Sequence, residues 1–326
     1  MSAATVSYIG SSNDTTPATT AEERALFLKV FSGEVLTAFE EYNMFLDKHN
    51  VRTISSGKQA QFPLFGRMPD AEYHTPGAEI VGQQIPMAEK TIDIDKLLIS
   101  HVFIPVLDDA ISHYDVRGKY ADMCGKKLAN TFDNHIGREL LLAAASSSPI
   151  TSDSTMGGTI VNDAELNSGT AATKLAAWVD GLFDAAAALD NKWVTGTRYC
   201  VTSPAYYYFL VQQMTSNGFS LINRDIDGRG SIADGNLVKV AGIDILSFPG
   251  LPTSDYSAET YHAVNAENTV GIIFTADAVG TVKLLDLNVE SEWDIRRQGW
   301  LTVAKYAMGH GILQGECSYQ LRTSAP

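Results

Sequence analysis

The sequence is poor in the residues that cross-link a chain or anchor it in a membrane. Its three cysteines, Cys124, Cys200 and Cys317, are widely spaced, odd in number and without a CxxC pair. A disulfide framework is therefore not expected, and a reducing compartment suits the chain. No uninterrupted apolar run reaches about 18 residues, which argues against a transmembrane helix. Residues 1–20 lack the basic start and apolar stretch of a signal peptide, and we expect them to form a flexible arm.

Basic residues are also scarce. The chain has 24 Lys and Arg against 38 Asp and Glu, a formal net charge of −14. Binding to phosphates requires a dense group of cations, so this balance argues against a surface that binds nucleic acid. It does not exclude a chain that lies close to DNA without binding it. With 45% hydrophobic and 19% charged residues, the composition is that of a folded, non-membrane protein.

The short motifs of common catalytic sites are missing. Gly57-Lys58 has the ending of a phosphate-binding loop, but the upstream glycine of GxxxxGK[ST] is absent and Gln59 replaces the hydroxyl residue. Neither GxSxG nor HExxH occurs. We therefore predict neither an enzyme nor a bound cofactor.

One segment has the oxygen-ligand spacing of a calcium-binding loop. Asn223, Asp225 and Asp227 precede Gly228, and Asp234 occupies the closing position. The closing residue is Asp rather than the longer Glu, and no clear pair of helices flanks the segment. The alternative, which we favour, is a turn rich in Gly and Asp between a helix and a strand.

The sequence predicts a projecting β-hairpin over residues 51–96. Residues 51–65 have an extended character, and residues 90–95 alternate strictly between apolar and polar side chains, the period of a half-buried strand. Several prolines and glycines lie between the two stretches. So long a connection is uncommon in compact domains unless it has a function.

A long helix is predicted after this hairpin. Asp115 can cap it, and apolar residues recur at three- to five-residue intervals over residues 116–145. Thirty helical residues extend about 45 Å at 1.5 Å each, which suggests a spine for other layers.

The rest of the chain alternates helices and strands, which predicts an α+β protein with two interleaved lobes. Residues 146–170 are expected to form a loop. A helix is expected over 21–31, and its apolar pattern continues through 35–39. Further helices are expected over 172–190 and from Pro204 onward. Strands are expected at 198–202, 237–248, 261–264, 270–275, 281–290 and 301–306.

Five sequence blocks resemble the major capsid proteins of the T-seven group of podophages. They occur in that family's order, and the middle of the chain, 146–270, resembles the family only loosely. The blocks are residues 26–39 (LFLKVFSGEVLTAF), 51–63 (VRTISSGKQAQFP), 113–117 (HYDVR), 278–284 (AVGTVKL) and 304–311 (AKYAMGHG).

The resemblance implies a capsid subunit of the Hong Kong 97-type fold. It places an N-terminal arm at 1–50, an extended loop at 51–96, a peripheral domain at 97–169 and 276–326 with its spine helix at 116–145, and an axial domain at 170–275. Such subunits form pentamers and hexamers of an icosahedral phage head around double-stranded DNA, after assembly in the host cytoplasm. The implied partners are other copies of the chain, a scaffolding protein, a portal protein and decoration proteins, with no membrane involved.

With this resemblance, we expect the hairpin to contact a neighbouring subunit. Its strands are expected not to bury an apolar face within their own subunit, so Phe62, Leu64 and Phe65 would need a neighbour's surface. Its basic residues suit a neighbour's carboxylates. Packing within the same subunit is the alternative. The expected interface residues are Arg52, Lys58, Phe62, Pro63, Leu64, Phe65 and Arg67.

Two other functions fit parts of the sequence. An encapsulin-type cellular compartment shares the fold, although the podophage-type blocks disfavour it. An acidic soluble enzyme with dispersed catalytic residues would also escape a search for motifs.

Overall fold

The computed structural model of the protein describes residues 34–68, 71–77, 79–80, 82–105, 116–150, 154–216 and 239–325. The chain divides into two compact units, each assembled from three separate stretches. Unit 1 takes residues 1–46, 95–132 and 284–308. Unit 2 takes residues 47–94, 133–283 and 309–326. Three elements contribute residues to both units: helix α3 (Val116–Ala145) and strands β10 (Val279–Asp294) and β11 (Gly299–Ile312).

Unit 1 combines a sheet with helices. Its strands are β4 (Leu98–Pro105) and the parts of β10 and β11 that belong to the unit, in the order β10, β11, β4. β4 and β11 run antiparallel, with Pro105 opposite Gly299. The helices are residues 34–42 and the first part of α3.

Aromatic side chains form the core of unit 1. Phe39, Phe132 and Tyr306 are buried and pack edge to face, with ring centroids 5.8 to 6.5 Å apart. Gly125 allows helix 34–42 to approach α3, because a Cβ there would lie 2.7 Å from the carbonyl oxygen of Val35.

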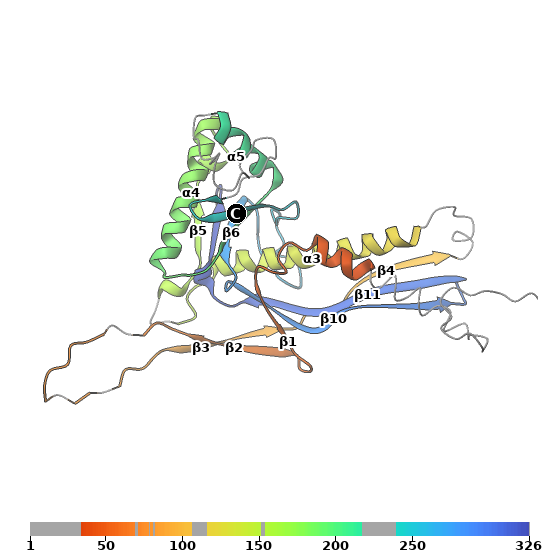
Figure 1. Cartoon of the computed structure of the whole chain (residues 1–326), viewed down its shortest axis with the longest axis horizontal. Helices are drawn as coiled ribbons and strands as arrows, with labels where there is room; N and C mark the ends of the chain where they lie inside the picture. The colour runs from red at the N-terminus through yellow and green to blue at the C-terminus, as the bar shows by residue number, and fades with distance from the viewer. Residues whose placement is uncertain are drawn as a thin grey trace, which may run out of the picture. The chain divides into compact units, whose positions relative to one another are not determined.

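Unit 2 is centred on a mixed six-stranded sheet with helices α4 (Ala171–Asn191) and α5 (Pro204–Ser216) beside it (Figure 1). Three short 3-10 helices, η1 (Ser154–Met156), η2 (Ala164–Leu166) and η4 (Gly315–Cys317), flank the strands. The strands, in sheet order, are β5 (Thr159–Asn162), β12 (Ser318–Arg322), β9 (Thr269–Thr275), β6 (Arg198–Thr202), β8 (Ile243–Ser247) and β7 (Lys239–Val240).

Helix α4 packs closely on this sheet. Thr170 caps its first turn by accepting a hydrogen bond from the amide of Thr173. A Cβ at Gly271 of β9 would lie 3.3 Å from the Trp178 ring, and one at Gly181 would lie 3.2 Å from Leu321 of β12. The small residues therefore set the distance between helix and sheet.

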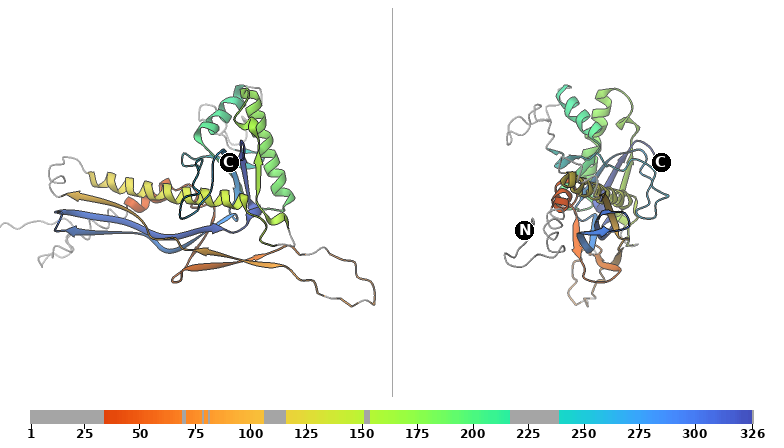
Figure 2. Two further views of the ribbon diagram at one scale, coloured as in Figure 1. Left: turned by 180° about the vertical axis from the view of Figure 1, so that it is seen from behind. Right: turned by 90° about the vertical axis from the view of Figure 1, so that its right-hand side faces the viewer.

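The predicted hairpin also belongs to unit 2. Strands β2 (Gln59–Phe65) and β3 (Met87–Asp93) run antiparallel, with Phe62 opposite Lys90. Figure 2 shows the two strands side by side and their long connection extending past the strand ends. The preceding strand, β1 (Asn50–Thr53), pairs in parallel with residues 280–283 of β10.

The structure confirms most of the predicted elements. Helix α3 and strand β6 have the predicted bounds, α5 opens at Pro204, and α4 is within one residue at each end. The strand predicted at 261–264 is wrong, because these residues form bends and irregular backbone, and the nearest pairing is an isolated bridge between Asp255 and Asn265. Strands β4, β5 and β12 were not predicted.

Some predictions fall outside the described residues. These are the arm at 1–20, the helix over 21–31, the helix cap Asp115, and the calcium-like candidates Asn223, Asp225, Asp227 and Asp234. Among the described helices, none is both long and apolar enough to cross a membrane.

Candidate functional site

The two strands of the hairpin have one covered face and one open face. Along β2, Ala60 and Leu64 are buried and Phe62 is half-buried, whereas Gln59, Gln61, Pro63 and Phe65 are exposed. Successive side chains of a strand point to opposite faces, so this alternation follows from the pleat. The exposed fraction rises from 5% for Leu64 to 61% for Phe65.

The covered face packs against other parts of unit 2. Ala60 and Ile92 form a buried cluster with Val282 of β10 and Leu313, and Phe62 packs against its edge. Leu64 is also buried within its own chain, so it does not depend on a neighbouring subunit for cover. The interface expected for Phe62, Leu64 and Phe65 stays a prediction. The covering residues are more than 180 positions away in the sequence, beyond the reach of local patterns.

Arg52 lies along its own hairpin. Its guanidinium donates a hydrogen bond of 3.0 Å to the carbonyl of Gln61 and lies 5.5 Å from the centre of the Phe62 ring. The guanidinium lies over the Phe62 ring, yet Arg52 remains exposed, as does Lys58.

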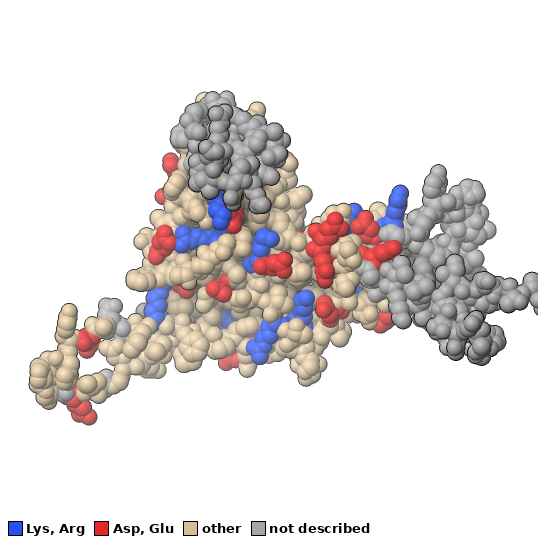
Figure 3. All heavy atoms as spheres, viewed as in Figure 1, with Lys and Arg blue, Asp and Glu red and all other residues tan. Residues whose placement is uncertain are grey.

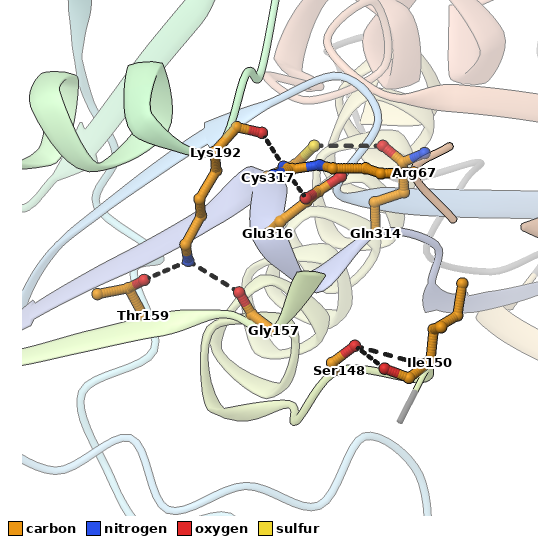
Figure 4. A network of polar contacts seen from close by, with 9 residues as sticks. All are labelled: Arg67, Ser148, Ile150, Gly157, Thr159, Lys192, Gln314, Glu316 and Cys317. Carbon is orange, nitrogen blue, oxygen red and sulfur yellow. Dashed lines mark hydrogen bonds and ion pairs between the residues drawn. The ribbon is translucent and has the colours of Figure 1, made fainter. Parts of the chain in front are cut away.

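Arg67 anchors the start of the connection to its own chain. Its guanidinium donates to the carbonyl of Lys192, which caps α4, and to the carboxylate of Glu316 at 3.1 Å (Figure 4). Lys192 in turn donates to the carbonyl of Gly157 at 2.8 Å and to the hydroxyl of Thr159 at 2.6 Å. Burial lowers the pKa of this lysine. Arg67, expected at the interface, therefore has hydrogen-bond partners within its own chain, and its contact with a neighbour stays a prediction.

A backbone contact closes the hairpin beyond the strands. The amide of Gly66 donates to the carbonyl of Pro86 at 2.8 Å. A Cβ at Gly66 would lie 2.8 Å from both Ile150 and Pro86, so a larger residue does not fit. The base of the connection is thus fixed, and we call residues 66–86 the connecting loop.

Apolar side chains on the connecting loop are open to solvent. Tyr73 is fully exposed and Ile80 is 80% exposed. Met68 and Ile85 in the loop, and Phe65 and Met87 at the adjoining strand ends, are also exposed. Six of the 18 large exposed hydrophobic residues in the described part of the chain thus lie within 23 positions. A concentration of this kind indicates a surface that another molecule covers.

A second feature of unit 2 is a group of four of the seven histidines in the chain. His49 and His310 are buried, and His135 and His262 are partly buried. Thr281 bridges His49 and His310 through hydrogen bonds of 2.8 and 2.9 Å. His262 lies 2.7 Å from the carboxylate of Glu139. Burial, followed by the neighbouring histidines, holds the pKa of His310 well below its usual range. This environment therefore favours the neutral form of the His310 imidazole.

Among the described residues drawn in Figure 3, Lys and Arg are interspersed with Asp and Glu. That distribution agrees with the low count of Lys and Arg in the sequence.

Comparison with known proteins identifies relatives over nearly the whole chain. Residues 61–322 match the family model described as "Gp10A-like: Major capsid protein". The chain is 33% identical over 325 residues to the major capsid protein of Enterobacteria phage T3 and 32% identical over 321 residues to that of Escherichia phage T7, with 91% of both partners covered each time. A solved capsid structure of the Cyanophage P-SCSP1u is 37% identical, with a TM-score of 0.74 and 100% of both chains covered.

Proposed function

The chain belongs to the T7- and T3-like major capsid protein family, and from this premise we propose that its connecting loop binds a neighbouring subunit in the phage head. Members of this family are structural, so the chain is a capsid component of the virion and not an enzyme. It self-assembles into an icosahedral head and has the α+β Hong Kong 97-like fold. The chain is 33% identical to a phage major capsid protein over 91% of its length. This match favours a phage head over the two alternatives, an acidic soluble enzyme and an encapsulin-type cellular compartment.

The observation that carries the proposal is the contrast between the two ends of the hairpin. Its base is fixed by the Gly66–Pro86 hydrogen bond and by Arg67, while Tyr73 and Ile80 lie open. A fixed base reduces the conformational entropy lost when the loop binds. The exposed apolar side chains supply area that is buried only in an assembly.

The domain layout and further partners extend this proposal. Residues 1–50 form an arm, 51–96 the extended loop, 97–169 and 276–326 the peripheral domain, and 170–275 the axial domain of subunits that build pentamers and hexamers. A scaffolding protein, a portal protein and decoration proteins complete the head. The net charge of −14 supports a shell that encloses DNA without binding it specifically.

Loop deletion tests the proposed role. Residues 68–84 are replaced by a short Gly-Ser turn, which keeps β2, β3 and the Gly66–Pro86 contact. Both chains are expressed with the scaffolding protein of the same phage, and particles are counted by electron microscopy and sedimentation. The wild type should form shells, and the variant should stay an unassembled subunit with unchanged circular dichroism. Shells from the variant at wild-type yield would refute the role of the loop.

A further inference from the structure

We propose that the acidic connecting loop of one copy binds the basic β10–β11 turn, residues 294–298, of another copy through Glu72 and Glu79 against Arg296 and Arg297. This inference rests on the proposed function, because it names the partner surface of the same loop. It concerns two surfaces of opposite charge that both carry exposed apolar residues.

The β10–β11 turn carries two adjacent arginines on a backbone that hydrogen bonds hold in place. Asp294 accepts hydrogen bonds from the amides of Arg296 at 2.9 Å and Arg297 at 3.3 Å, so its carboxylate is used within the turn. Behind the turn, the rings of Trp293 and Trp300 lie 5.2 Å apart. The backbone is thus held by contacts that leave the arginine side chains pointing to solvent.

Within the part of the chain that the structure describes, the guanidinium groups of the turn have few partners. Arg297 makes a long contact of 3.7 Å with Asp294, and its side chain is 73% exposed. Among the residues that the structure describes, Arg296 forms no ion pair. Ile295, between Asp294 and the arginines, is 72% exposed. The turn therefore offers two cations next to an apolar side chain.

The connecting loop offers the complementary set. Its sequence contains Asp70, Glu72 and Glu79 but only one cation, Arg67, which already binds Glu316. Glu72 and Glu79 are exposed, each next to an exposed apolar residue, Tyr73 and Ile80. Carboxylates accept the paired N–H donors of a guanidinium, and aromatic or aliphatic side chains fill the space beside them.

Another exposed basic surface is a stripe on α3, where Lys119, Met123 and Lys127 follow at four-residue spacing. It is the less suitable partner for two reasons. Lysine is depleted at protein interfaces and arginine is enriched, because the planar guanidinium binds carboxylates with defined geometry. The lysines are also two turns of helix apart rather than adjacent. This stripe provides the matched control.

Charge reversal tests the pairing. Arg296→Glu/Arg297→Glu places like charges opposite the loop and should lower the yield of shells by about tenfold or more. Adding Glu72→Lys/Glu79→Lys in the same chain should restore most of the yield, because the opposite charges are then exchanged. The control Lys119→Glu/Lys127→Glu should not be rescued by the same loop changes. Rescue of the control, or no rescue of the turn variant, would overturn the pairing.

Cross-linking tests whether the contact joins two copies. Chains with Glu72→Cys alone are assembled together with chains carrying Arg296→Cys alone, and the shells are oxidised. The native Cys124, Cys200 and Cys317 are buried, so they do not compete. A covalent dimer that requires both variants is expected; monomer alone would refute the proposal.

Different results would contradict the capsid function and the pairing of the loop with the turn. If the wild type forms no shells with its scaffolding protein, the proposed function is wrong. If the wild type and Arg296→Glu/Arg297→Glu form shells equally well, the capsid function stands and the pairing is wrong. Unchanged circular dichroism of each variant shows that the subunit itself remains folded.

Discussion

Substitutions at two neighbouring residues of β2 should affect different properties: one the stability of the folded subunit, the other its assembly into shells. Leu64 is 5% exposed and Phe65 is 61% exposed, although they are consecutive in the sequence. Replacement of Leu64 by Ala removes buried apolar volume, and buried Leu→Ala changes cost about 2–5 kcal/mol. Because a hairpin can partly collapse around the gap, we expect a loss of about 2–3 kcal/mol in the free energy of unfolding.

Phe65→Ala should have the opposite profile. Its ring is mostly exposed in the single chain, so the loss in free energy of unfolding should stay below about 1 kcal/mol. The interface loses an aromatic contact instead, and buried aromatic residues contribute strongly to binding. Shell yield should therefore fall for Phe65→Ala while the unassembled subunit unfolds at nearly the wild-type temperature.

The assay compares both variants with the wild type in two measurements. Thermal unfolding of the unassembled subunit, followed by circular dichroism, should show a midpoint lowered by roughly 5 °C for Leu64→Ala and little changed for Phe65→Ala. Sedimentation after co-expression with the scaffolding protein gives the shell yield. Equal destabilisation by the two changes, or normal shells from Phe65→Ala, would refute this division of roles.

Three further changes have defined outcomes. Gly309→Ala should lower the midpoint of thermal unfolding, because its Cβ would lie 2.1 Å from the carbonyl oxygen of Asp93. Gly82→Ala is the control: no atom lies within 4 Å of a Cβ there, so the midpoint should stay unchanged. Arg67→Ala should cost about 0.5–1 kcal/mol of stability, an effect that shrinks in high salt because the Arg67–Glu316 pair is only partly buried. The pKa of His310 is lower in the folded chain than in the unfolded chain, so as the pH falls the unfolded chain binds a proton at His310 before the folded chain does. The free energy of unfolding should therefore be level above about pH 6.5 and fall below it. His310→Gln should flatten the decline between pH 6.5 and 5.5 in thermal melts; an unchanged decline would assign it to other groups.

The helices and the strands with clear periodicity could be predicted from local sequence. Helix α3 shows apolar residues at helical spacing over its full length, and β6 is a short apolar run between a turn and Pro204. Strand β5 could not be found this way, because its four residues lie in a segment rich in Ser, Thr and Gly. Its strand conformation depends on pairing with β12, about 160 residues away.

The candidate surface was predicted in position but not in detail. The alternation of Ala60, Phe62 and Leu64 is present in the sequence, but it does not show what covers that face. Val282 and Leu313 do so, and only the folded chain brings them to β2. The same holds for Arg67, whose partner Glu316 is 249 positions away. The predicted residues therefore divide into those that hold the hairpin and those that remain exposed.

The alternation along β2 also has a consequence for inheritance in mixed infections. A Leu64 variant that fails to fold is removed by proteases, so a wild-type copy in the same cell compensates and the defect is recessive. A Phe65 variant folds, still offers its other surfaces to wild-type subunits and enters the shell with a defective loop. Because a single defective subunit impairs a closed shell built from many subunits, that defect should be dominant. Two adjacent codons would thus give lesions of opposite genetic behaviour.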